Sequence, residues 1–186
     1  MTPTITYIDE LVVRCRKGDQ RAQMEIYNKY YKAMYNTALR IVKDPAEAED
    51  VMQEAFIKAF AKINSFQGKS TFGAWLKKIT VNRSINSFNK QSKFQNVSYE
   101  DQFKYETEED QGIDIKEEEA NSKVKKVLKA MEGIKDSYRI ALNLHLIEGY
   151  DYDEICEILD ISAANCRTLI SRAKESLRKK LLENEI

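Results

Sequence analysis

The chain has 186 residues and carries 30 Lys or Arg against 30 Asp or Glu, so it has no formal net charge. That length suits one large domain or two small ones. Two prolines and six glycines, with abundant Lys, Glu, Ala, Leu and Ile, favour a mostly helical fold. No apolar run approaches the roughly 20 residues of a membrane-spanning helix, and the N-terminus lacks the basic and apolar segments of a signal peptide. We therefore expect a helical protein without membrane insertion.

Chemistry-bearing residues are few and scattered. The three cysteines, Cys15, Cys156 and Cys166, include no closely spaced pair of the kind that binds zinc, and we interpret them as small packing residues in a reducing compartment. His145 is the single histidine. The chain has no complete Gly-x-x-x-x-Gly-Lys-Ser/Thr phosphate loop, no His-Glu-x-x-His motif and no serine nucleophile elbow. The sequence predicts no enzymatic activity, no metal and no cofactor.

Charge is distributed unevenly along the chain. Between Glu54 and Glu100 there is no acidic residue. The same window holds eight basic residues and, interleaved with them, six phenylalanines and one tryptophan. Cations attract phosphate, and aromatic rings can stack on unpaired bases. This window therefore predicts a surface that binds nucleic acid.

Residues 96–120 are predicted to link two helical domains, residues 1–95 and 121–186. Within this linker, residues 99–119 contain ten acids against two lysines, with few aliphatic side chains and no sustained helical period. Such a segment cannot bury enough apolar surface to fold alone.

The first domain is predicted to contain at least two helices. Apolar residues recur at helical spacing over residues 19–43, and residues 44–45 supply a capping aspartate and a first-turn proline for the next helix. On that second helix Asp50, Gln53 and Glu54 share one face, opposite the apolar side. Taken alone, such a face is most often simply solvated.

Three motifs in the first domain, residues 50–56, 66–72 and 75–82, resemble in order and spacing region 2 of bacterial sigma factors. The resemblance is closest to the extracytoplasmic-function (ECF) group, which keeps only regions 2 and 4. It implies that Asp50, Gln53 and Glu54 dock on the clamp coiled coil of the largest catalytic subunit of RNA polymerase. The resemblance also assigns contacts with the promoter −10 element to eight residues: Phe66, Gln67, Lys69, Ser70, Lys77, Lys78, Asn82 and Arg83.

Within that set, the resemblance gives Asn82 a place in a pocket for a flipped-out base. It makes the residues from 66 to 70 loop contacts, and it gives the phosphates to Lys77, Lys78 and Arg83, together with Lys90. The chain also departs from the family. Asn86 and residues 89–90 stand where many members have an acid and then a run of arginines. The basic wall for upstream duplex DNA is therefore thinner here.

The second domain is predicted to begin with two helices. Residues 121–131 form the first, and residues 137–148 form the second, which Gly149 ends. The predicted core-facing residues of these two helices are Val124, Val127, Leu128, Met131, Ile140, Ala141, Leu144 and Ile147.

A short helix, a tight turn and a longer basic helix follow. Residues 151–154 form a capping box, Ser162 caps the last helix after a turn at residues 161–162, and that helix runs to about residue 181. This arrangement predicts a helix-turn-helix, whose second helix enters the DNA major groove. The residues predicted to be buried on the last helix are Cys166, Ile170, Ala173 and Leu177.

Residues 149–181 resemble region 4 of ECF sigma factors, which recognises the −35 element. By that resemblance the exposed positions of the last helix contact bases and phosphates: Arg167, Thr168, Ser171 and Arg172, with Lys174 on the DNA backbone. Residues 163–166 and Leu169 depart from the usual sequence of the recognition helix, so the DNA sequence that is read cannot be copied from a relative.

Together these patterns predict an all-α protein of two small domains that acts as an ECF sigma factor in the bacterial cytoplasm. The implied partners are core RNA polymerase, promoter DNA and an anti-sigma factor. On the polymerase, the clamp would bind the N-terminal domain and the flap region would bind the C-terminal domain. The acidic linker either imitates nucleic acid in the polymerase cleft or is a plain tether. Two other functions stay open: a dimeric helix-turn-helix regulator acting without polymerase, and a sigma mimic that titrates an anti-sigma factor.

Overall fold

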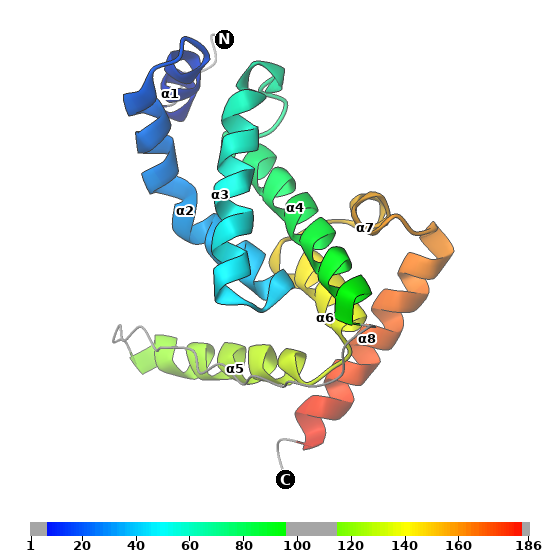
Figure 1. Ribbon diagram of the computed structural model, residues 1–186. Coiled ribbons are helices and arrows are strands. Elements are labelled where there is room, and N and C mark those ends of the chain that lie inside the picture. Colours follow the sequence, from blue (N-terminus) through cyan, green and yellow to red (C-terminus); the bar gives the residue numbers. More distant parts are fainter. Residues whose placement is uncertain (1–6, 96–114, 184–186) are drawn as a thin grey trace. The chain divides into compact units, whose positions relative to one another are not determined.

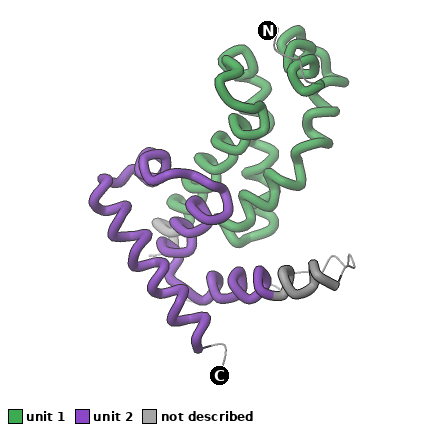
Figure 2. The backbone as a smooth tube through the Cα atoms, turned by 180° about the vertical axis from the view of Figure 1, so that it is seen from behind, with its two compact units in different colours: residues 1–96 green, residues 97–186 purple. Residues whose placement is uncertain are grey.

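The computed structural model describes residues 7–95 and 115–183, and every regular element in these ranges is a helix (Figure 1). The chain divides into two compact units, residues 1–96 and 97–186 (Figure 2). The all-α fold predicted from the sequence is confirmed. Residues 96–114, which make up most of the predicted acidic linker, lie outside the described residues.

In its described residues, 7–95, unit 1 contains four α-helices and one 3₁₀ turn. They are α1 (Tyr7–Arg16), α2 (Gln20–Val42), α3 (Pro45–Ala61), η1 (Ile63–Ser65) and α4 (Phe72–Gln95). Helices α2, α3 and α4 pack on one another, and α1 packs on α2 and η1. Their shared core is aliphatic and aromatic, with Leu11, Ile26, Phe56 and Leu76 among its buried members.

Side-chain caps fix where these helices begin. The Asp19 carboxylate accepts the backbone N–H groups of Arg21 and Ala22 at the start of α2, at 2.9 and 3.2 Å. Asp44 caps α3 by accepting the Glu47 N–H at 2.8 Å. Each cap satisfies donors that a helix N-terminus would otherwise leave unpaired. The cap fixes where α3 begins, and packing against α2 and α4 decides which of its residues reach solvent.

Unit 2 contains α5 (Ile115–Glu132), α6 (Asp136–Leu142), a π-helical turn η2 (Asn143–Ile147), α7 (Tyr152–Leu159) and α8 (Ala163–Glu183). Helix α8 packs against α5, α6 and α7. All four residues predicted to be buried on α8 are buried, between 0% and 7% exposed. The helix-turn-helix therefore has the core that the spacing predicted.

Helix α5 differs from its prediction in two ways. It begins at Ile115 rather than at residue 121, and the added segment, residues 115–120, contains three consecutive glutamates, which are good helix formers. Val124 and Leu128, predicted to face the core, are 56% and 38% exposed. Burial on α5 is concentrated near its C-terminal end, at Ala130 and Met131, so the apolar stripe extends beyond the surface that covers it.

The π turn corrects a second prediction. Ile147, the last residue of η2, is predicted from helical spacing to face the core, but it is 38% exposed. The Glu148 N–H donates to the Asn143 carbonyl at 2.9 Å, an i to i−5 bond. The extra residue in this turn rotates the chain out of the α-helical register. Gly149 then ends the segment as predicted, with a φ of +80° that suits glycine.

Candidate polymerase and DNA interfaces

The acid–amide–acid face predicted on α3 exists. Asp50, Gln53 and Glu54 are all exposed, and the opposite side of α3 is buried in the unit 1 core. The Gln53 amide donates to the Glu49 carboxylate at 3.2 Å, one turn back along the helix. The face therefore carries three carboxylates, including Glu49, on a rigid helix, which suits a basic partner surface.

Glu54 also joins this face to α4. The Arg83 guanidinium donates to the Glu54 carboxylate and forms an ion pair with it. The two residues had been assigned to different partners, Glu54 to polymerase and Arg83 to the −10 DNA. The structure brings them together, so the two predicted surfaces meet along the edge between α3 and α4.

The loop between η1 and α4 holds the next predicted contacts. Gln67, Lys69 and Ser70 are exposed, and Gly68 has a φ of +70°. Phe66, by contrast, is only 6% exposed, and its ring packs against Phe72 and Trp75 with centroid distances of 5.6 and 5.4 Å. The Phe66 side chain is therefore part of the core and supports the loop rather than offering its ring to DNA.

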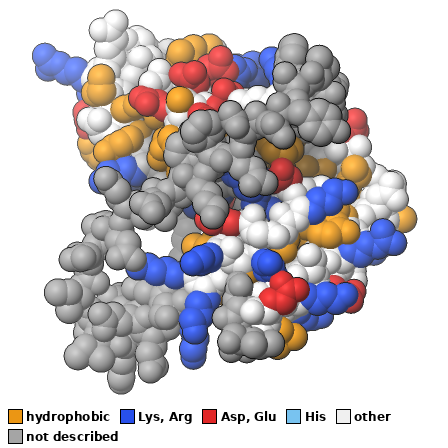
Figure 3. Space-filling view, turned by 60° about the horizontal axis from the view of Figure 1, so that its bottom comes forward, with side chains coloured by type: hydrophobic (Ala, Val, Ile, Leu, Met, Phe, Trp, Pro, Cys, Tyr) orange, Lys and Arg blue, Asp and Glu red, His pale blue; other side chains and the backbone are white. Residues whose placement is uncertain are grey.

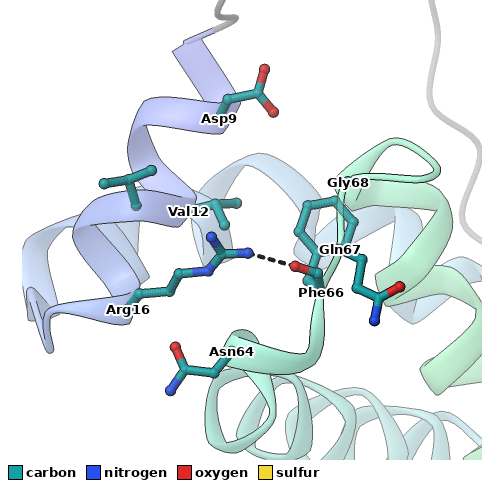
Figure 4. A pocket seen from close by; sticks show the side chains of 8 residues that line it. Asp9, Val12, Arg16, Asn64, Phe66, Gln67 and Gly68 are labelled. Atoms are coloured by element: carbon teal, nitrogen blue, oxygen red, sulfur yellow. Dashed lines mark hydrogen bonds between the residues drawn. The ribbon is translucent and has the colours of Figure 1, made fainter.

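A contact from α1 holds the loop from the other side. The Arg16 guanidinium donates to the Phe66 carbonyl oxygen, and both residues line a depression of about 580 Å³ (Figure 4). Asp9, Val12 and Asn64 also border this depression. Because Arg16 is fifty positions away in sequence, no local pattern could reveal it. Its helix was detectable only through the spacing of its buried residues: Leu11, Val12 and Cys15.

Helix α4 presents its predicted DNA-contacting residues along two different edges. The Thr71 hydroxyl caps the helix by accepting the Ala74 N–H at 3.2 Å. Lys78 and Asn82 are one turn apart and share an edge that solvent reaches. Arg83 is directed toward α3 through its ion pair with Glu54. Lys77 is half-buried.

The helix-turn-helix is built as the sequence predicted. Asp151 accepts the Glu154 N–H at 2.8 Å, and the Glu154 side chain accepts the Asp151 N–H at 3.0 Å, which completes the capping box of α7. The turn passes through Asp160 with a φ of +53°. Ser162 then caps α8 by accepting the Asn165 N–H at 3.3 Å.

The outward face of α8 gathers the predicted −35 residues. Arg167, Thr168, Ser171 and Arg172 are exposed, and Lys174 is half-buried at the flank of this face. The Thr168 hydroxyl donates to the Ala164 carbonyl at 3.0 Å, which leaves its lone pairs and methyl group toward solvent. The space-filling view of one side of the molecule shows basic, acidic and apolar side chains intermixed on the surface of the described residues (Figure 3). The α8 face has the chemistry of a major-groove reader.

Two thiols lie behind this face. Cys166 is fully buried, and its thiol donates to the Tyr152 carbonyl at 3.7 Å. Burial, together with a hydrogen bond to the Cys156 thiol, raises the pKa of Cys166 to about 11. A protonated, buried thiol acts as a small packing group. The structure thus places Cys166 where the two helices of the motif meet.

Other chemistry is sparse in the described part of the chain. His145 stacks on the Tyr152 ring with a centroid distance of 5.1 Å, and its Nδ1 lies 3.1 Å from the Tyr150 carbonyl oxygen. Among the residues described, no three His, Cys, Asp or Glu side chains are grouped to hold a metal ion. Along 7–95 and 115–183, no helix combines the length and apolar content of a membrane span.

Comparison with known families matches both units. Residues 26–94 match Sigma-70 region 2, and residues 125–177 match Sigma-70 region 4. The first match covers α3, the loop and α4, and the second covers the helix-turn-helix. The two regions predicted from the sequence, region 2 followed by region 4, are therefore confirmed.

Similar proteins extend the match over nearly the whole chain. The RNA polymerase sigma-H factor of Pseudomonas aeruginosa is 30% identical over 180 residues, and the ECF RNA polymerase sigma-E factor of Escherichia coli K12 is 31% identical over 177 residues. Each alignment covers 92% of this chain and 92% of the relative.

Solved structures agree with the fold. The chain is similar to CnrH, solved in complex with the cytosolic domain of CnrY, with a TM-score of 0.55, 20% identity and coverage of 95% of this chain and 97% of that one. It is also similar to the sigma factor RpoE of Bartonella quintana, solved with the anti-sigma factor NepR, with a TM-score of 0.59, 20% identity and coverage of 85% and 95%. With region 2, region 4 and full-length relatives in agreement, the chain belongs to the extracytoplasmic-function sigma factors, which direct transcription initiation by bacterial RNA polymerase.

Proposed function

We propose that unit 1 docks on core RNA polymerase and opens the −10 element, while unit 2 reads the −35 element. The observation that carries this division is the exposure of the α3 acidic face and the α8 basic face on separately packed units. An acidic helix face suits a basic protein surface, and a basic recognition helix suits duplex DNA.

Docking on polymerase uses Asp50, Gln53 and Glu54. All three reach solvent from a helix whose other side is anchored in the core, so the helix backbone needs no rearrangement to meet a partner. The partner surface is the helical clamp of the largest catalytic subunit. The C-terminal unit meets the flap region of the same enzyme.

Contacts with the −10 element come from the loop and from α4. Gln67, Lys69 and Ser70 present polar groups from the loop, and Lys78 and Asn82 present theirs from one edge of α4. Unstacking a base costs a few kcal/mol, which hydrogen bonds and stacking in a pocket offset. Phe66 and Arg16 hold the loop in place. Lys77 and Arg83 contribute positive charge that attracts the DNA phosphates.

Recognition of the −35 element falls to the exposed face of α8. Arg167, Thr168, Ser171 and Arg172 reach the base edges and adjoining phosphates, and Lys174 adds a backbone contact from the flank. A base contact specifies sequence, whereas a phosphate contact positions the helix. Replacing Arg172 should therefore change which sequence is preferred, and replacing Lys174 should weaken all sequences alike.

The free chain binds promoter DNA weakly, because each unit alone offers a small surface. Docking on core polymerase holds both units at the spacing of the promoter elements and makes the two contacts cooperative. Footprinting tests this proposal. Core polymerase plus the chain should protect both promoter elements, and the chain alone should protect neither. Sequence-specific protection by the chain alone would instead favour a helix-turn-helix regulator that works without polymerase.

An anti-sigma factor is the third partner that we propose. CnrH was solved with the cytosolic domain of CnrY, and the Bartonella quintana protein was solved with the anti-sigma factor NepR. By this proposal the chain works in the bacterial cytoplasm, where its polymerase resides. A pull-down with the tagged chain, followed by identification of the proteins retained, should recover core polymerase and one small partner.

A further inference from the structure

Ile57 is the most exposed of the large hydrophobic residues in the described ranges, at 70%. It lies on α3, seven positions after Asp50, four after Gln53 and three after Glu54. Residues at these spacings share one helix face. The acidic face proposed to dock on polymerase therefore continues, toward the C-terminal end of α3, into an aliphatic side chain.

The fold does not require isoleucine at this position. The core side of α3 is complete without it, through Val51, Met52, Ala55, Phe56 and Ala59. A β-branched residue also forms a helix less readily than alanine does. A single exposed aliphatic residue is ordinary on a protein surface. What distinguishes Ile57 is its position in a row of polar residues that meet a partner.

We propose that Ile57 is the apolar anchor of the α3 docking face, covered in the complex by an aliphatic side chain on a basic helical surface of core RNA polymerase. This inference rests on the proposed function, since it extends the same interface. Two observations support that occupant. Glu49, Asp50 and Glu54 give the N-terminal part of the face a negative charge, which selects a basic surface. Past Ile57 the face continues with Ala61, which is exposed and small, so a second helix can approach closely.

The physical basis is the usual arrangement of a protein interface. A buried apolar centre supplies most of the binding energy, and a polar rim supplies orientation and selectivity. Asp50, Gln53 and Glu54 would orient the partner helix, and Ile57 would lose its water when that helix is seated. Since Ile57 touches little in the free chain, removing its side chain should affect binding far more than folding.

Titration of core RNA polymerase into the fluorescently labelled full-length chain tests this. We expect Ile57→Ala to weaken binding about tenfold or more, the size typical of an interface anchor. Met24→Ala is the matched control, because Met24 is 58% exposed on α2 and the change removes a large apolar side chain from unit 1 outside the α3 docking face. It should leave binding within about twofold of the parent chain. The thermal melting temperature of Ile57→Ala should equal or exceed that of the parent, because alanine is the better helix former.

Asp50→Ala separates failure of this inference from failure of the proposed function. If Asp50→Ala weakens binding and Ile57→Ala does not, the anchor is disproved and the docking face stands. If neither variant weakens binding, the docking face itself is disproved, and the anchor with it. Salt gives a second test, because screening reduces charge contacts but not apolar burial. The loss caused by Asp50→Ala should shrink as salt is raised, and a loss at Ile57→Ala that shrank in parallel would overturn the anchor.

Discussion

The two units position their proposed binding surfaces in different ways. In unit 2 the contacts that shape the helix-turn-helix are local: Asp151 with Glu154, Ser162 with Asn165, and Cys166 with Tyr152, fourteen positions apart at most. In unit 1 the loop is held by Arg16, fifty positions away, and α3 is joined to α4 by an ion pair across 29 positions. On a recognition surface made of one helix, neighbouring positions and local caps set the arrangement of the side chains, whereas a surface made of a loop and two helices also depends on contacts between residues far apart in sequence.

The largest expected effect tests whether the units are stabilised separately. Ile170 is 1% exposed on α8, so Ile170→Asp places an unpaired charge in the unit 2 core and should cost at least about 3 kcal/mol. Small domains have little stability to spare, so unit 2 should unfold. Far-UV circular dichroism should then show a loss of helix, and −35 binding should disappear.

Trp75 reports on the other unit, because it is the only tryptophan and packs with Phe66 and Phe72 in unit 1. Its fluorescence melting curve should not move in Ile170→Asp. Ser171→Asp, one position along on the exposed face, controls for the added charge and should leave unit 2 folded. A Trp75 transition that shifted together with the loss of helix would show that the two units fold as one.

A smaller effect comes from the buried thiol of unit 2. Its environment raises the pKa of Cys166 to about 11, so the folded chain holds this proton more tightly than the unfolded chain does. The stabilisation is complete below the pKa of the unfolded thiol and is lost as pH rises through the folded value. Between about pH 8 and about pH 10, unit 2 should lose about 1 kcal/mol through this group.

Urea unfolding followed by circular dichroism, with reductant present, measures that loss. Cys166→Ala removes the titrating group and should flatten this part of the pH dependence, even though it also lowers stability at every pH. Burial raises the pKa of Tyr150 to about 12, so its contribution starts to be lost near pH 10, where unfolded tyrosine titrates. Tyr150 is present in both chains, so the difference between their pH slopes reports Cys166. Equal pH slopes in the parent chain and in Cys166→Ala would contradict the assignment.

The same contrast between local and distant contacts explains what could be predicted from the sequence. The buried and exposed faces of α8 followed from helical spacing alone, and the caps at Asp44 and Asp151 followed from residue type. The predictions for Ile147 and Phe66 were wrong, because each position depends on a structural feature that helical spacing does not reveal. A π turn rotated Ile147 outward, and an aromatic cluster drew Phe66 inward, because packing overrides local pattern where a helix or loop meets the core.

A comparison of two glycines tests whether the unit 1 loop needs its shape. Gly68 and Gly18 have φ values of +70° and +81°, and an added Cβ would meet nothing within 4 Å at either position. Alanine should therefore cost the same backbone strain at both sites, about 1 kcal/mol. Melting temperatures should fall equally, but only Gly68→Ala should impair promoter opening, measured as permanganate reactivity of the −10 thymines with core polymerase. Equal impairment by Gly18→Ala would attribute the defect to stability.

The smallest expected effect concerns the ion pair between Glu54 and Arg83. Both side chains are partly exposed, at 56% and 32%, so solvent screens their attraction. A double-mutant cycle with Glu54→Gln and Arg83→Gln should give a coupling energy of about 0.2–1 kcal/mol that falls with added salt. Glu54→Gln should also leave binding of a −10 single strand unchanged or tighter, because Arg83 is released toward phosphate, while it weakens docking on core polymerase. A coupling energy of zero would mean that the α3 face and the α4 face of unit 1 act independently of each other. The contrast with unit 2 would then rest on the Arg16 contact alone.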